Sequence, residues 1–208
     1  MQQKELISMK ENKGRLFILS GPSGAGKSTV ICEVLKRNPS LHFSVSYTTR
    51  PPRPEERDGA QYYFVNRSDF EAMIARNEFL EYTEYVGNYY GTSRPKMEAY
   101  LNAGTDVLLD IEVRGASNVR AKIPEAVSIF FLPPSFVELE RRLRARNTDH
   151  EEKIAKRLQT AREEYEKARC YDYIVVNSDV NAAAREVEAI ITAERCKMAN
   201  RLYLIKEE

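Results

Sequence analysis

The sequence predicts an α/β fold in which a parallel β-sheet is covered by helices on both faces. Three observations lead to this prediction: short apolar runs, amphipathic stretches between them, and the alternation of the two along most of the 208 residues. Short apolar runs are typical of strands that are buried on both faces, and their alternation with helices is typical of a parallel sheet. The length suits one domain that carries one or two small insertions.

Four apolar runs are predicted to form the strands of this sheet. They are Arg15–Ser20, Asp106–Val113, Ala126–Leu132 and Tyr171–Asn177. Each run is far shorter than the roughly 20 apolar residues that a membrane-spanning helix needs. We therefore expect these runs to build the core of a globular protein, and we expect no membrane partner.

Helical patterns lie between the predicted strands. The first, KSTVICEVLKR, places apolar residues at helical spacing and stops before Asn38-Pro39, because proline cannot continue a helix. The other helices are predicted at about residues 94–103, 115–122, 135–146 and 152–168, and from about 180 into the 190s.

Residues 43–92 interrupt this alternation. Two aromatic stretches, Gln61–Val65 and Phe79–Gly91, have the composition of short strands, and a short helix is predicted near Ser68–Arg76. The second stretch contains Gly87-Asn88, which indicates a hairpin turn. We expect a small mixed insertion here, mostly antiparallel.

Composition excludes several classes of function. The net charge is +1, from 32 basic and 31 acidic residues, so nothing general favours nucleic acid as a partner. The two histidines are far apart in sequence, which disfavours a histidine-based metal site. The three cysteines are widely separated, and the N-terminus does not resemble a secretory signal. These features predict a reducing compartment and hence the cytoplasm.

The segment GPSGAGKS, Gly21–Ser28, fits the phosphate-binding pattern G-x-x-x-x-G-K-[ST] in full. It lies between a predicted strand and a predicted helix, which argues against a plain glycine-rich turn. Glycines let backbone N–H groups converge on a phosphate, and the helix N-terminus adds partial positive charge. Lys27 can reach the β- and γ-phosphates, and Ser28 can offer its hydroxyl to Mg²⁺. The predicted triphosphate site comprises Gly21, Pro22, Ser23, Gly24, Ala25, Gly26, Lys27, Ser28 and Thr29.

A second stretch, TTRPPRPEERDGAQYYF, resembles the signature of guanylate kinases. The phosphate loop resembles theirs too, and the match continues in the family's order from about Leu16 to about Ile190. Its other parts are GNYYGTS (Gly87–Ser93), LDIEVRGA (Leu109–Ala116), FFLPPS (Phe130–Ser135) and the arginine-rich segment that follows. The resemblance implies a P-loop NTPase-type fold with a GMP-binding insertion and a helical lid. It also implies transfer of the γ-phosphoryl group of ATP to GMP, and to dGMP.

This resemblance suggests how the chain is divided. Residues 1–13 would be an N-terminal tail, residues 46–92 the GMP-binding insertion and residues 135–153 the lid. The core would comprise residues 14–45, 93–134 and 154–208. Mg²⁺ is expected with ATP, no organic cofactor is expected, and a homo-oligomer is left open.

The residues of the second stretch suit a site for the acceptor phosphate. Arg50 and Arg53 lie three positions apart on backbone that is stiffened by prolines, and planar guanidinium groups can clamp a phosphate dianion. Tyr62 and Tyr90 can each donate a phenolic O–H to the same phosphate, and the resemblance assigns all four residues to GMP. Glu56 either supports this clamp or forms a plain ion pair.

The resemblance assigns Glu81 to the guanine edge, with Ser46, Thr92 and Asp110 nearby. A carboxylate accepts hydrogen bonds from guanine N1–H and the exocyclic amine, whereas adenine has no N1–H and would leave the carboxylate unpaired. Asp110 also ends a predicted strand, where an acidic residue often supports Mg²⁺. The sequence leaves three roles open for Asp110: the metal shell, the guanine amine and a capping position at the strand end.

Arginines follow in the predicted lid. Arg142 and Arg146 are one helical turn apart, and Arg157 lies across a polar gap. The resemblance places all three over the ATP phosphates, where they would act with Lys27 in catalysis. Because Arg141 and Arg144 are close in sequence, a shift of register in this assignment is left open.

Two other classes of protein are alternatives. Some guanylate-kinase-like domains are non-catalytic peptide-binding modules, but these typically lack an intact phosphate loop. A P-loop GTPase or ATPase switch is disfavoured because the chain has no N-K-x-D motif and does have an acceptor-phosphate clamp. Three positions depart from the family pattern: Glu55 replaces a common glycine, Glu112 the usual aspartate and Val113 a bulkier residue. None of these changes removes a residue that is assigned to chemistry.

Overall fold

The computed structural model describes residues 13–85, 87–145, 150–201 and 204–205. Residues 1–12 of the predicted tail and Arg146 of the predicted lid lie outside the described residues.

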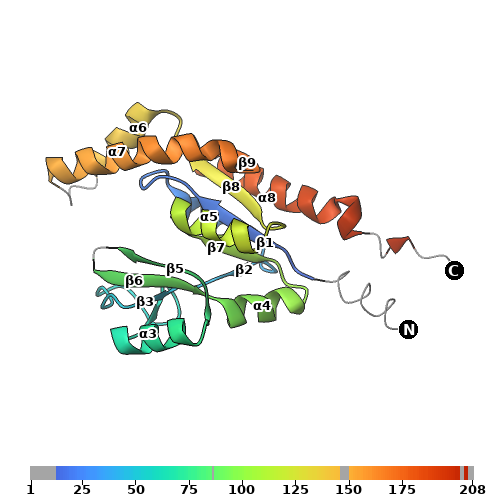
Figure 1. Cartoon of the computed structure of the whole chain (residues 1–208). Coiled ribbons are helices and arrows are strands. Elements are labelled where there is room, and N and C mark those ends of the chain that lie inside the picture. The colour runs from blue at the N-terminus through green and yellow to red at the C-terminus, as the bar shows by residue number, and fades with distance from the viewer. Residues whose placement is uncertain (1–12, 86, 146–149, 202–203, 206–208) are drawn as a thin grey trace.

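A parallel sheet, here called the main sheet, forms the centre of the molecule (Figure 1). Within the described residues it has five strands in the order β2-β7-β1-β8-β9, and every neighbouring pair is parallel. The strands are β1 (Leu16–Ser20), β2 (His42–Phe43), β7 (Val107–Asp110), β8 (Val127–Leu132) and β9 (Tyr173–Val176). The predicted α/β fold class is confirmed.

Helices cover both faces of the main sheet (Figure 1). They are α2 (Lys27–Arg37), α4 (Arg94–Asn102), α5 (Val113–Lys122), α6 (Phe136–Arg144), α7 (Glu151–Lys167) and α8 (Val180–Cys196), with 3₁₀ turns at Ala168–Cys170 and Met198–Asn200. Phe17 and Leu19 of β1 pack with α2 and α8, and the alternate residues Leu16 and Ile18 pack with α4 and α5. Among the described helices, none has both the length and the apolar character needed to cross a membrane.

The insertion forms a second sheet, here called the small sheet, with strand order β4-β3-β6-β5. Its elements are β3 (Tyr47–Thr48), β4 (Tyr63–Phe64), α3 (Arg67–Ala75), β5 (Phe79–Tyr85) and β6 (Asn88–Ser93). β3 and β4 are parallel, whereas β6 is antiparallel to both β3 and β5. Gly87, with a φ of 75°, lies between β5 and β6. The sheet agrees with the expected mixed insertion, but the domain boundaries themselves stay predictions.

The structure differs from the sequence-based predictions at three places: two short strands and one strand end. β2 and β3 were not predicted because each is only two residues long and has no apolar run of its own. Val113 was expected to end a strand, but it begins α5, with Glu112 as the N-cap. That apolar run continues directly into a helix, so hydrophobicity alone could not locate the boundary.

A buried carboxylate ties the start of β1 to the end of α8. Asp106 is 6% exposed. It accepts hydrogen bonds from the Arg15 backbone N–H at 2.7 Å and from Arg195 Nε at 2.6 Å.

We expect Asp106→Ala to lower the free energy of unfolding by about 2–3 kcal/mol, because it removes the partner of the part-buried Arg15 N–H and of Arg195. Urea denaturation measures this change. Arg76→Ala, which breaks the exposed ion pair with Glu78, is the control and should change stability by less than about 0.5 kcal/mol. Equal stability of Asp106→Ala and the unmodified chain would contradict the role of this tie.

Candidate active site

The phosphate loop connects β1 to α2. Gly21, Gly24 and Gly26 have φ angles of 141°, 96° and 84°, a region that side chains rarely allow. Lys27 Nζ donates to the Gly21 carbonyl at 2.7 Å, so the lysine lies against the loop that precedes it. Gly26 is the N-cap of α2 and has no side chain to occupy the first N–H groups of the helix. The local geometry therefore suits an anion.

A polar brace supports the loop from the carboxyl end of β9. Asn177 Nδ2 donates to the Ala25 carbonyl at 2.8 Å. Arg142 donates to the same carbonyl at 3.3 Å and to the Asn177 carbonyl at 3.0 Å. The Glu138 carboxylate accepts a hydrogen bond from Arg142 Nε at 2.8 Å. A Cβ at Gly26 would lie 2.3 Å from Asn177 Nδ2, so only glycine fits against this brace.

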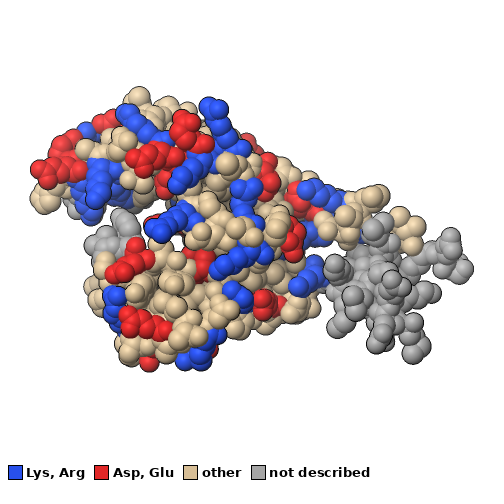
Figure 2. Space-filling model, viewed as in Figure 1, with Lys and Arg blue, Asp and Glu red and all other residues tan. Residues whose placement is uncertain are grey.

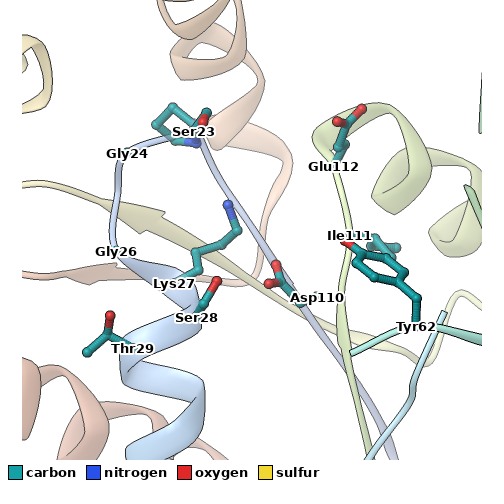
Figure 3. Close-up of a pocket in the computed structure, with 11 residues that line it drawn as sticks. Ser23, Gly24, Gly26, Lys27, Ser28, Thr29, Tyr62, Asp110, Ile111 and Glu112 are labelled. Atoms are coloured by element: carbon teal, nitrogen blue, oxygen red, sulfur yellow. The ribbon is translucent and has the colours of Figure 1, made fainter. Parts of the chain in front are cut away.

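The loop lines a cavity of about 310 Å³ (Figure 3). Lys27, Ser28 and Asp110 point toward the same space, and Tyr62 approaches from the opposite wall. The lining residues are Pro22, Ser23, Gly24, Gly26, Lys27, Ser28, Thr29, Tyr62, Asp110, Ile111 and Glu112.

A second cavity of about 240 Å³ lies beside the small sheet. It is lined by Ser46, Tyr62, Glu81, Thr83, Tyr90, Gly91, Asp110, Ile111, Glu112 and Gly115. Tyr62, Asp110, Ile111 and Glu112 also line the first cavity, so the two cavities share one wall. Two binding sites placed here would open toward each other.

A third cavity of about 550 Å³ lies between the phosphate loop and α7. Its lining is rich in basic groups, and Figure 2 shows Lys and Arg side chains on the α7 side of the hollow between α7 and the small sheet. Arg157 donates to Ser23 Oγ of the loop. The lining residues are Gly21, Ser23, Lys27, Glu112, Lys153, Lys156, Arg157, Thr160 and Glu164.

Burial raises the pKa of four carboxyl groups that line these cavities: Glu81, Asp110, Glu112 and Glu164. Glu81 is 6% exposed, and its Oε1 accepts a hydrogen bond from Thr92 Oγ1 at 2.7 Å. Burial raises the pKa of Glu81 and the nearby Glu112 adds to the rise, whereas Thr92 and Lys122 oppose it.

Burial also raises the pKa of Asp110, against the opposing charge of Lys27. Because Asp110 lines both the phosphate-loop cavity and the Glu81 cavity, its position leaves the metal and guanine roles open.

The arginine-rich loop is organised by Glu56. Both carboxylate oxygens of Glu56 accept from Arg50 Nη2, at 2.8 and 2.9 Å, and Oε2 also accepts from the Arg53 backbone N–H at 2.8 Å. This pairing lowers the pKa of Glu56 and raises that of Arg50. The Arg50 guanidinium lies 5.6 Å from the Tyr62 ring centroid, and Tyr62 lies 5.9 Å from the Tyr90 ring. The Arg53 side chain is exposed.

The structure distinguishes among the arginines of α6. Arg142 reaches the phosphate loop, whereas Arg141 pairs with Glu138 and Arg144 pairs with Glu140 and Glu151. Of these three side chains, the one chosen from the sequence is therefore the one that contacts the loop. Arg146 lies outside the described residues.

Several residues that support the loop or line the cavities were not assigned a role from the sequence. Asn177 had a usable signal, because it follows a parallel strand and the carboxyl ends of such strands meet at one edge of the sheet. The others line the cavities and were given no role from the sequence: Thr83, Gly91, Ile111, Glu112, Gly115, Lys153, Lys156, Thr160 and Glu164.

Comparison with known proteins gives consistent matches. The family model described as guanylate kinase matches residues 13–194. A guanylate kinase of Thermus thermophilus is 54% identical over 90% of this chain and 83% of its own length. One from Desulfitobacterium hafniense is 46% identical over 95% of this chain and 99% of its own length. The crystal structure of guanylate kinase from Anaplasma phagocytophilum matches with a TM-score of 0.75 and 34% identity, over 92% of each chain.

The burial of Glu81 generates a prediction about stability. Its folded-state pKa is raised from 4.5, so the folded state binds more protons than the unfolded state just above that pH. The free energy of unfolding therefore falls as the pH rises through this window. Glu81→Gln removes the charge, so we expect it to be more stable than the unmodified chain by about 1 kcal/mol near pH 8, with the difference shrinking toward about pH 4.

Urea denaturation across this pH range measures the difference. Glu84→Gln, on the same strand but exposed, is the matched control: because it keeps Glu81, its difference in stability from the unmodified chain should stay the same across this pH range. Parallel pH profiles for Glu81→Gln and the unmodified chain would contradict the prediction.

Proposed function

The chain belongs to the guanylate kinase family, and we propose that it transfers the γ-phosphoryl group of ATP to GMP, and to dGMP, giving ADP and the diphosphate. The observation that carries the proposal is the wall shared by the phosphate-loop cavity and the Glu81 cavity. A triphosphate in the first cavity and a monophosphate nucleotide in the second would meet there, which is the arrangement that direct transfer needs.

The acceptor would be held at both ends. Arg50, Tyr62 and Tyr90 lie together and supply N–H and O–H donors for the phosphate, and Arg53 belongs to the same loop. At the other end, the Glu81 carboxylate would accept from N1–H and the exocyclic amine of guanine. Ser46 lines the same cavity and offers a hydroxyl. Adenine would leave the buried carboxylate without partners, so it would be rejected.

The donor phosphates would lie on the glycine loop and the first turn of α2. Lys27 lines both the phosphate-loop cavity and the α7 cavity, so its ammonium would lie beside the donor phosphates. Arg142 and Arg157 approach the loop from α6 and α7 and would add positive charge over the phosphates. These groups would stabilise the charge that spreads over the equatorial oxygens in the transition state.

The reaction requires no general base. The attacking oxygen belongs to a phosphate monoester whose second pKa is about 6, so it is already anionic near neutral pH. Catalysis would then consist of positioning and charge stabilisation. Approach of α6 and α7 toward the small sheet would exclude water, which is the competing acceptor.

The residues at the loop also fit Mg²⁺. The Ser28 hydroxyl and the Asp110 carboxylate line one cavity, and hard oxygen ligands of this kind suit the ion. Among the described residues, no group of three or more His, Cys, Asp or Glu side chains could hold a metal. Mg²⁺ usually completes its shell with water and substrate phosphate, so a sparse protein set is in keeping with it. When bound, it would neutralise part of the negative charge of the triphosphate.

Other functions have less support. A non-catalytic binding module has no use for a complete phosphate loop with Lys27, Ser28 and a contact from Arg157. As the compartment we propose the cytoplasm, because Cys32, Cys170 and Cys196 are exposed free thiols, which persist in reducing surroundings.

The acceptor specificity can be tested with an assay that couples ADP release to a detectable signal, using GMP, AMP, CMP and UMP in parallel. We expect kcat/KM for GMP to exceed that for AMP by more than about 100-fold, because only guanine pairs with the carboxylate. Equal use of AMP would contradict the assignment of Glu81.

We expect Lys27→Met to lower kcat by at least about 100-fold while the protein stays folded, because the charge that stabilises the transferring phosphoryl group is lost. Steady-state kinetics and circular dichroism check both parts. Lys36→Met, at an exposed lysine of the same helix, is the control and should keep full activity. An active Lys27→Met protein would remove Lys27 from the mechanism.

A further inference from the structure

We propose that helix α5 positions the guanine-reading carboxylate: Gly115 leaves the space that Glu81 occupies, and Lys122 holds the neighbouring backbone of β5. The inference rests on the proposed function, because it assigns to α5 a part in choosing guanine over adenine. Gly115 and Lys122 act through Glu81 and are positioning residues.

Gly115 is placed directly against the carboxylate. It lines the same cavity as Glu81, and a Cβ built on it would lie 2.9 Å from Glu81 Oε2 and 3.4 Å from Glu81 Cδ. The next atom, Ile111 Cβ, is 3.7 Å away, which is an ordinary contact. A methyl group here would therefore press on Glu81 and on little else.

The helix itself does not require glycine at this position. Gly115 is the third residue of α5, and its φ lies outside the left-handed region, so alanine fits the backbone. Alanine is also the better helix former. The packing of Glu81 against the helix is thus the contact that an alanine side chain would disturb.

Lys122 fixes the strand that carries Glu81. Its ammonium donates to the carbonyl of Leu80, the residue just before Glu81. Lys122 and Gly115 are seven positions apart, about two helical turns, so both lie on the face of α5 that meets β5. Thr92 Oγ1 donates to Glu81 Oε1, so a hydrogen bond holds one carboxylate oxygen while the other, Oε2, faces Gly115.

A displaced carboxylate would enter the space that the base edge needs. Pressure from a methyl group would move the flexible end of Glu81 by a fraction of an ångström, and recognition by paired hydrogen bonds is sensitive to such shifts. Binding of guanine would weaken, and the ratio of kcat/KM for GMP over AMP would fall, because a misplaced carboxylate pairs poorly with either base.

The test is Gly115→Ala, assayed with GMP and AMP. We expect KM for GMP to rise about tenfold while kcat changes less than about threefold, and the ratio of kcat/KM for GMP over AMP to fall. The melting temperature should be equal or higher, because alanine favours the helix. Asn118→Ala, at an exposed position of α5, is the matched control and should leave KM unchanged.

A double substitution tests whether Gly115 acts through Glu81 or through a general effect on the structure. In a Glu81→Ala background, which removes the group that the methyl would press on, the further substitution Gly115→Ala should change KM for GMP by less than about twofold, because the two residues act through one contact. Lys122→Met should raise KM about threefold, and Lys122→Arg should restore it because arginine keeps the donor.

Each outcome decides the proposal. An unchanged KM and GMP/AMP ratio in Gly115→Ala, or an equal effect with and without Glu81, would overturn it. If Gly115→Ala does not fold, the Lys122→Met loss and its rescue by arginine decide in its place, and an unchanged KM in Lys122→Met overturns the role of Lys122. Failure of the unmodified protein to prefer GMP would instead refute the proposed function.

Discussion

Two phosphate-bearing molecules repel each other, and bringing both into one cleft is the constraint on which this structure depends. Each must meet positive groups and hydrogen-bond donors that are in place before it binds. In the proposed function, the phosphate loop at the edge of the main sheet would provide one set, and the residues around Arg50 and Tyr90 at the small sheet would provide the other. The end of β7, with Asp110 and Glu112, forms the wall between them. The carboxyl edge of a parallel sheet is where such a meeting point can be built.

The arrangement has a cost in stability. Burial raises the pKa of Glu81 and of Asp110, so both carboxyl groups are held where ionisation is unfavourable. The surroundings lower the cost without removing it: Thr92 donates to Glu81, and the charge of Lys27 acts on Asp110. Selection for stability alone would not favour the burial of these two carboxyl groups. Their presence in the cleft is consistent with selection for recognition and chemistry.

The features that could be predicted from the sequence are those encoded by residues that are contiguous along the chain. The phosphate loop could be predicted because its glycines, Lys27 and Ser28 are contiguous, and the long buried strands could be predicted from their apolar runs. β2 and β3 could not, because each is two residues long, has no apolar run of its own and is defined only by its pairing with a neighbouring strand. Asn177 and Gly115 were missed for a related reason: each acts through a residue distant in sequence, Ala25 for the first and Glu81 for the second. Tertiary contacts, rather than a local sequence pattern, bring these two residues into the site.

The central claim is that one chain holds a triphosphate and a monophosphate nucleotide at the same time. Calorimetric titration of GMP into protein saturated with Mg²⁺ and a non-hydrolysable ATP analogue tests it most directly. The account predicts one GMP bound per chain, with the analogue still in place. Displacement of the analogue by GMP, or no GMP binding while the analogue is bound, would contradict it.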